Sequence, residues 1–223
     1  MAVSLQDGAL TTLSAVLEEL GAPTGADDYL KRQINRLSDL FEEATGREWY
    51  RDPNVTESVP SVGDTRILIS RPKLRSVSQI EVQGDTVDAG AYEIEDADAG
   101  IIRLDDAFWE STAVVTRRVT QTIRYHEDRV EVTYDAGYVT PKQVDDNTFS
   151  DRDLPHHIEG AIIDSVATKF RRKGQPSDVQ SESIGSASVA YKSGVDTATL
   201  FGQTVSSSFV AAAQRHRDRS VLP

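Results

Sequence analysis

The chain has 223 residues with 36 acidic against 24 basic side chains, a formal net charge of −12. This charge disfavours DNA binding, because affinity for DNA comes mainly from cations that displace the counterions of phosphate. Hydrophobic residues make up 38% of the sequence, enough for a chain of this length to bury a core. There is no cysteine, so disulfides, thiol nucleophiles and thiolate metal sites are excluded.

No apolar run approaches the roughly 18 residues that a membrane span needs, and the N-terminus shows no basic region followed by an apolar one. We therefore expect no membrane contact and no export. The acid surplus has two interpretations. One is ordinary solubility, and the other is adaptation to a salty cytoplasm, where carboxylates keep a protein hydrated while salt screens their repulsion.

The first fifty residues predict two helices that form a hairpin. Apolar residues recur at helical spacing before Gly21 and Pro23, which is the pattern of a helix and its stop signal. A second helix begins at Asp27 or Asp28 and ends at Gly46. Its apolar stripe consists of Leu30, Ile34, Leu37, Phe41 and Ala44.

From about residue 53 to 140 the apolar period changes to two, which predicts a small, mainly antiparallel β unit. Within it, residues 92–104 (YEIEDADAGIIRL) are acidic enough to suggest a calcium loop. An EF-hand loop that began at Asp96 would need glycine at its sixth position and glutamate at its twelfth. Gly100 falls fifth and Ala107 twelfth, so we predict a β-hairpin that turns near Gly100, and no metal site.

A third helix is expected from Pro155 to Gly174, because proline suits a first turn and an apolar face follows it. It ends in a basic cluster of Lys169, Arg171, Arg172 and Lys173. Two interpretations of this cluster stay open. The cations can stabilise the negative end of the helix dipole, or they can contact phosphate or an acidic partner surface.

The remaining sequence predicts an extended polar arm with a β-like patch at 186–191, and then a short helix from Val205 to about Arg219. In that helix an apolar run that starts with Phe209 and Val210 precedes three arginines, Arg215, Arg217 and Arg219. Such a segment is typical of a helix that docks in a groove on another protein.

Motifs of catalysis are missing from the sequence. His156 and His157 are adjacent, so on a helix they point about 100° apart and cannot share one metal ion, and His126 and His216 have no visible partner. There is no GxSxG, SxxK or phosphate-binding glycine loop. Acid pairs such as 105–106 and 145–146 are expected on solvated faces. We therefore predict no enzyme, no cofactor and no catalytic or metal-binding residue.

Together these elements predict an α+β fold. It comprises a helical body of three to four helices, an antiparallel β insertion and an extended C-terminal arm that ends in a short helix. The expected segments are the N-terminal helical hairpin (1–50), the β-rich insertion (51–150), the third body helix (151–176), and the arm with its helix (177–223).

The order of these features resembles the head-to-tail connector adaptor proteins, also called head-completion proteins, of tailed double-stranded DNA viruses. The resemblance spans roughly residues 8–192, and its individual motifs are soft. It is carried by EEATGREW (42–49), SRPKLRSVSQIEVQGDTVDAGAYEIEDADAGIIRL (70–104), VEVTYDAGYVT (130–140), the helix at 155–174 and SESIGSASVAY (181–191).

The resemblance implies a structural protein of the virion neck, assembled in the host cytoplasm, that forms a ring of twelve copies beneath the portal. The ring would extend the DNA channel without binding DNA specifically, and would offer its lower face to the next neck or tail protein. Carried onto this sequence, the portal-docking candidates are Ser181, Ile184, Val189, Tyr191, Phe209, Val210, Arg215, Arg217 and Arg219.

Two parts of the chain depart from the family pattern. Residues 105–129 form a longer link than expected between two strands, and the tail from Gly194 onward has no residue-by-residue match. Three other functions remain open. The nearest is another neck component, such as a stopper or tail-completion protein. The others are an acidic module that mimics DNA and a hydrolase with a carboxylate-bound metal.

Overall fold

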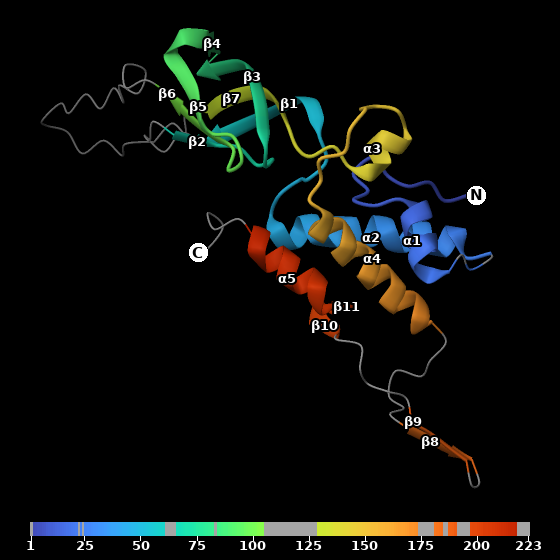
Figure 1. Ribbon diagram of the computed structural model, residues 1–223. Helices are drawn as coiled ribbons and strands as arrows, with labels where there is room; N and C mark the ends of the chain where they lie inside the picture. The colour runs from blue at the N-terminus through green and yellow to red at the C-terminus, as the bar shows by residue number, and fades with distance from the viewer. Residues whose placement is uncertain are drawn as a thin grey trace, which may run out of the picture. The chain divides into compact units, whose positions relative to one another are not determined.

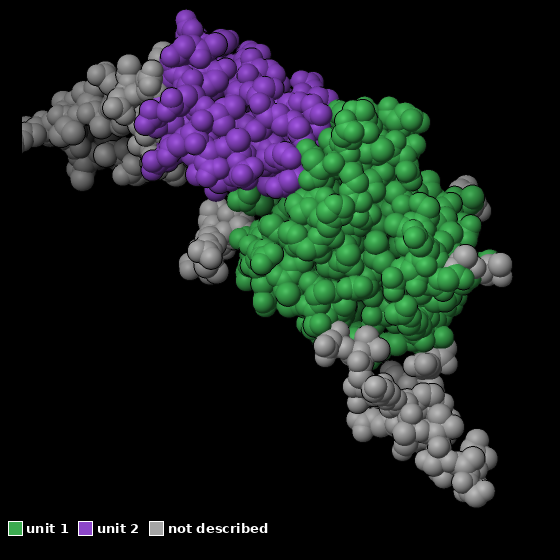
Figure 2. Space-filling model, in the orientation of Figure 1, with its two compact units in different colours: residues 1–50, 139–223 green, residues 51–138 purple. Residues whose placement is uncertain are grey.

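The computed structural model describes residues 2–21, 23, 25–60, 66–82, 84–104, 129–173, 181–184, 187–190 and 197–217. The chain divides into two compact units (Figure 2). One consists of residues 1–50 and 139–223 and contains the helices, and the other consists of residues 51–138 and is built of strands. This is the mixed α+β fold that the sequence predicts. Residues 139–150, expected in the β insertion, lie in the helical unit.

The helical unit contains α1 (Leu13–Leu20), α2 (Asp27–Thr45), α3 (Pro141–Asp145), α4 (His156–Arg171) and α5 (Ser207–His216) (Figure 1). The sequence predicted α1 and α2 from their stop signals. Gly21 and Gly46 adopt left-handed conformations, with φ of 71° and 69°, and so end the two helices. Thr12 caps the start of α1 by accepting a hydrogen bond from the backbone of Ala15.

The short helix α3 was not predicted, although its start carries a complete signal. The Thr140 side chain accepts a hydrogen bond from the Gln143 backbone, and the Gln143 side chain accepts one from the Thr140 backbone. Pro141 occupies the first turn. This is a capping box, which satisfies backbone donors that a helix start leaves without partners.

The core of the helical unit lies around α4, which packs against α1, α2 and α5. Aromatic rings join three of its segments. Phe41 on α2 lies 5.5 Å from the ring of Trp49 and 5.5 Å, edge to face, from the ring of Phe209 on α5. All three rings are buried, and such pairs stabilise a core beyond the effect of burial alone.

A hairpin of β10 (Thr197–Leu200) and β11 (Gln203–Ser206) precedes α5 and packs on α4 and α5. The sequence predicts that these residues belong to the arm and to the start of the last helix, so this hairpin differs from the prediction. Ser206 joins its end to the core. Its backbone N–H donates to the Ser165 hydroxyl, 3.0 Å away, and its own hydroxyl caps α5 at Phe209. Earlier in the chain, β8 (Ser181–Ile184) and β9 (Ala187–Ala190) form a separate two-stranded hairpin.

The described residues of the β unit form two antiparallel sheets and a short 3-10 turn (Ala89–Ala91). The first sheet has the order β1-β7-β3-β4, from strands Asp52–Pro60, Arg129–Ala136, Leu74–Val82 and Asp85–Thr86. The second has the order β2-β6-β5, from Arg66–Leu68, Ile101–Leu104 and Tyr92–Asp96. Their shared core includes Ile69, Ile80, Ile102, Val132 and Tyr134. Burial and a 2.6 Å hydrogen bond to Glu57 raise the pKa of the Tyr134 hydroxyl.

The acidic stretch 92–104 forms the predicted hairpin, with β5 paired to β6. Gly100 has φ of 75° at its turn, and a Cβ added there would lie 2.7 Å from Cγ1 of Ile69. Only glycine fits this position. The Asp96 carboxylate accepts a hydrogen bond from the Ala99 backbone, so this acid stabilises the turn itself.

Candidate docking surfaces

The four cations of the basic cluster at the end of α4 all contact other parts of the helical unit. The Arg171 guanidinium lies 3.3 Å from Glu19, and the Lys173 ammonium lies 4.4 Å from the centre of the Tyr29 ring. Lys169 and Arg172 donate to side chains of the β10–β11 hairpin, at Gln203 and Thr197. Burial, and then the nearby Arg36, lower the pKa of Lys169. The cluster thus holds the end of α4 against its neighbours, and contact with an outside phosphate or acidic surface stays a prediction.

The portal-docking candidates on α5 separate into a buried residue and exposed ones. Phe209 is fully buried in the helical core, so its side chain does not face a partner in this conformation. Val210 is partly exposed, and Arg215 and Arg217 are exposed. The spacing of the buried residues Phe209, Ala212 and Ala213 is that of an inward-facing helical stripe.

The remaining candidates lie in the arm or near the end of the chain. Ser181 and Ile184 lie at the two ends of β8, and Val189 lies on β9, opposite Glu182. Tyr191 and Arg219 lie outside the described residues. Docking by these five residues stays a prediction.

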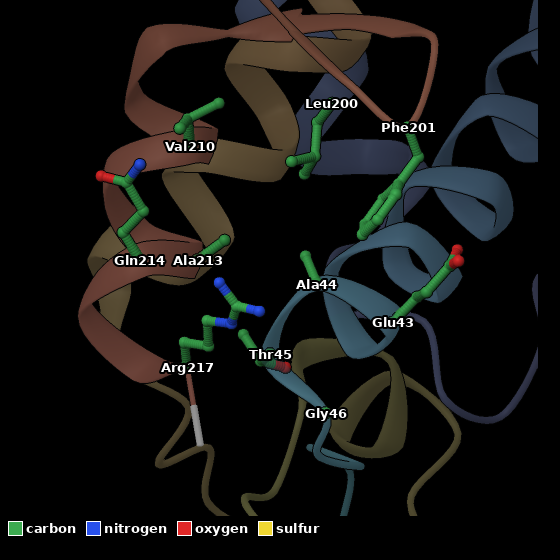
Figure 3. Close-up of a pocket in the computed structure, with 10 residues that line it drawn as sticks. All are labelled: Glu43, Ala44, Thr45, Gly46, Leu200, Phe201, Val210, Ala213, Gln214 and Arg217. Atoms are coloured by element: carbon green, nitrogen blue, oxygen red, sulfur yellow. The ribbon is translucent and has the colours of Figure 1, made fainter. Parts of the chain in front are cut away.

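A pocket of about 320 Å³ opens between the end of α2, the β10–β11 turn and α5 (Figure 3). Its walls are mainly apolar, and one cation extends into it. The lining residues are Glu43, Ala44, Thr45, Gly46, Leu200, Phe201, Val210, Ala213, Gln214 and Arg217. Figure 3 shows the Arg217 guanidinium turned toward the α2 end, while the Glu43 carboxylate points away from it.

Phe201 at the rim of this pocket combines two unfavourable properties. Its side chain is 62% exposed, the most exposed large hydrophobic side chain among the described residues. Its φ is 46°, and the following Gly202 has φ of 74°, so both central residues of this two-residue turn are left-handed. Turns of this kind favour asparagine or glycine at the first position, because a Cβ there crowds the backbone.

Two histidines form a pair near the C-terminal end of α5, and the sequence did not indicate this pair. His157 in the first turn of α4 and His216 at the end of α5 stack at 16°, with their Nε2 atoms 2.7 Å apart. The rings of Trp49 and His216 are nearly perpendicular, with centroids 5.0 Å apart. The pKa of His216 is lowered by burial first, and then by His157, Arg215 and Arg47. Burial and Arg215 lower the pKa of His157. The neutral form of the pair is favoured, with one ring donating to the other.

Within the described part of the chain, no three histidine or acidic side chains group as a metal site would require. Asp146 is paired with Lys142, one turn earlier along the chain, rather than with another acid. No helix among the described residues is long and apolar enough to cross a membrane. Asp105 and Asp106 lie outside these residues.

No protein-family model matches the chain, and no curated protein matches it. Chains of several solved structures share its fold, and three of them are as follows. A chain in the neck of an empty gene transfer agent (GTA) particle, computed with C6 symmetry, is 12% identical with a TM-score of 0.55. A chain in the virion of the native GTA particle is 14% identical with a TM-score of 0.53. A chain in the neck of the native particle, computed with C12 symmetry, is 14% identical with a TM-score of 0.50.

Each alignment covers 100% of this chain and 96% of the other chain. The likeness therefore extends over both compact units and is not confined to one supersecondary motif. It confirms, at the level of the fold, the resemblance to connector proteins that the sequence indicated.

Proposed function

We propose that this chain is a structural protein of the neck of a tailed virus-like particle. In that role it forms an adaptor ring between the capsid portal and the next neck or tail protein. The observation that carries the proposal is the fold shared over the whole chain with a protein in the neck of a GTA particle. The order of sequence motifs supports the same role independently of the structure.

The symmetry of the similar structures supports a ring. The GTA necks were computed with C6 and C12 symmetry, and we propose twelve copies for this chain. In a closed ring each copy offers one surface to the copy before it and a different surface to the copy after it. A ring of twelve would carry twelve times the net charge of −12. Such a ring lets DNA slide, because its net negative charge repels phosphate on average.

The arm suits contact with the portal. Within the described residues, β8 and β9 pair only with one another. An isolated two-stranded hairpin is marginally stable in water, so it gains most when a partner surface covers it. In this proposal the hairpin binds the portal together with the partly exposed Val210 and the exposed Arg215 of α5, and with the exposed Arg217 that follows the helix. The β unit faces a neighbouring copy or the tail.

Another neck component, such as a stopper or tail-completion protein, is the second candidate, because the neck likeness by itself does not distinguish positions along the neck. The two differ in what they bind. An adaptor binds a bare portal, whereas a stopper needs an adaptor ring already in place. An acidic module that mimics DNA would instead bind a cationic protein in competition with DNA.

The test is electron cryomicroscopy of DNA-filled capsids that carry a bare portal, mixed with the purified chain. A ring directly beneath the portal is the expected result. Truncation after Gly194 would remove Phe209 from the core, so the arm is tested by replacing residues 180–191 with a short Gly-Ser linker. The charge-reversal control Arg32→Glu lies on an exposed part of α2.

Loss of the ring on replacing the arm, with the control ring intact, supports docking by the arm. A folded wild-type chain that leaves the bare portal empty contradicts the adaptor role. If density appears only below a ring of a different protein, the chain is a stopper or tail-completion protein.

A further inference from the structure

We infer that the pocket between α2, the β10–β11 turn and α5 is a docking site for a segment of another protein in which an acidic side chain stands beside a large aliphatic one. The carboxylate would meet Arg217, and the aliphatic side chain would enter the space between Leu200, Phe201 and Val210. Val210 and Arg217 of this pocket are also among the residues that the proposed function assigns to portal contact. The inference is tested on the pocket alone and holds whichever protein supplies the segment.

The size and lining of the pocket fit such an occupant. Its volume of about 320 Å³ lies at the lower end of the range of roughly 300–1,000 Å³ that is usual for ligand pockets. Ala44, Leu200, Val210 and Ala213 provide apolar walls. An aliphatic side chain buried there would move from water to an apolar surface, which is how anchor residues stabilise complexes.

The charge at the pocket selects an acidic segment. Arg217 extends into the pocket (Figure 3), and within the described residues no carboxylate is paired with it. Arg215, also exposed, adds a second cation at the same end of α5. The acid in the lining, Glu43, points away (Figure 3). A guanidinium at the edge of an apolar space binds a carboxylate by charge-assisted hydrogen bonds, which are stronger than neutral ones.

The conformation of Phe201 points to binding independently of charge. A bulky aromatic residue in a left-handed turn costs free energy that asparagine would avoid. Because the Phe201 side chain is 62% exposed, its burial offsets little of that cost. Aromatic side chains at a pocket rim provide large contact area for a partner. Residues held in unfavourable conformations occur preferentially at such sites.

The probe is the peptide acetyl-Ser-Glu-Leu-Leu-Glu-Ser-amide, compared with a matched peptide in which lysine replaces both glutamates. Both are titrated into the ¹⁵N-labelled full chain and followed by backbone amide chemical shifts. We expect saturable shifts at residues 43–46 and 200–217 with the acidic peptide, and at least tenfold weaker binding of the basic one. Equal binding of both peptides, or shifts elsewhere on the chain, overturns the inference. The inference is also overturned if binding does not saturate below about 10 mM peptide, which corresponds to a binding free energy weaker than roughly 3 kcal/mol.

Variants separate binding from folding. Arg217→Glu should weaken the acidic peptide at least tenfold, whereas Arg32→Glu, which changes the net charge equally, should change it less than twofold. Phe201→Asn should weaken binding severalfold while the unfolding midpoint stays the same or rises. Unchanged binding in Phe201→Asn, or an equal loss in both arginine variants, contradicts the proposal. Self-association of the free chain that Arg217→Glu abolishes would make a second copy the occupant, and would also overturn it.

Discussion

Two hairpin turns of this protein differ in which residue occupies the left-handed conformation. In the β5–β6 turn the left-handed position is occupied by Gly100, and the surrounding Ile69 leaves no room for a larger residue. In the β10–β11 turn the first left-handed position is occupied by Phe201, although no close packing demands it there. In the first turn, the residue present is the one that makes the turn most stable. The second retains an unfavourable residue, and the inferred docking of another molecule at Phe201 would account for it.

The largest expected effect in this comparison is that of Gly100→Ala. The left-handed conformation should cost about 1–2 kcal/mol, and the 2.7 Å approach to Ile69 should add about 1–3 kcal/mol of crowding. The free energy of unfolding, measured by urea denaturation, should therefore fall by about 2–5 kcal/mol. A loss below 1 kcal/mol would show that the turn can shift to another conformation.

A smaller loss is expected from Gly202→Ala in the other turn. Its φ is 74°, but no atom lies within 4 Å of the added Cβ. Only the backbone cost remains, about 1–2 kcal/mol. The same urea experiment measures it, and a loss equal to that of Gly100→Ala would show that crowding contributes nothing at Gly100.

Phe201→Asn should stabilise the protein by about 0.5–1 kcal/mol, because asparagine tolerates the left-handed region better than phenylalanine. The gain appears as a higher urea midpoint with an unchanged slope. Ile94→Thr, at the other exposed large hydrophobic side chain among the described residues, is the matched control and should bring no such gain. A clear destabilisation by Phe201→Asn would mean that the ring supports the fold.

The smallest expected effect is a dependence on pH that involves α5 and not the β5–β6 turn. Burial and then Arg215 lower the pKa of His157, and burial followed by His157, Arg215 and Arg47 lowers the pKa of His216. The folded state therefore binds fewer protons than the unfolded state, and stability should fall as pH drops below about 6.5. Replacing both histidines with glutamine should reduce the loss of stability between pH 7 and pH 5. An identical pH dependence in wild type and double variant would exclude this contribution.

Much of the fold could be predicted because its signals are local. The apolar stripe of α2 and its Gly46 stop predicted a helix that the structure places at Asp27–Thr45. Gly100, between two alternating apolar runs, predicted the β5–β6 hairpin. The signal of α3 is also local, because Thr140, Pro141 and Gln143 form its capping box. The sequence prediction nevertheless did not include this helix.

The β10–β11 hairpin and the docking surfaces could not be predicted in the same way. A Phe-Gly turn is not the Asn-Gly or Asp-Gly pattern that marks a hairpin, and the flanking strands, TATL and QTVS, contain few large apolar residues. The pocket joins residues 43–46 to residues 200–217, and His157 meets His216 across 59 positions of sequence. Such pairs depend on how α2, α4 and α5 pack, which no local pattern encodes.

The placement of the arm has a mechanical consequence. The arm begins after α4 and ends at β10. The end of α4 and the β10–β11 hairpin are joined by the Lys169–Gln203 and Arg172–Thr197 hydrogen bonds. A pull on the arm therefore enters the helical unit at two adjacent attachment points and loads these two polar contacts first. The Ser165–Ser206 hydrogen bond behind them anchors the β10–β11 hairpin to α4. Tension on the arm would be absorbed at the surface of the unit before it reached the aromatic core.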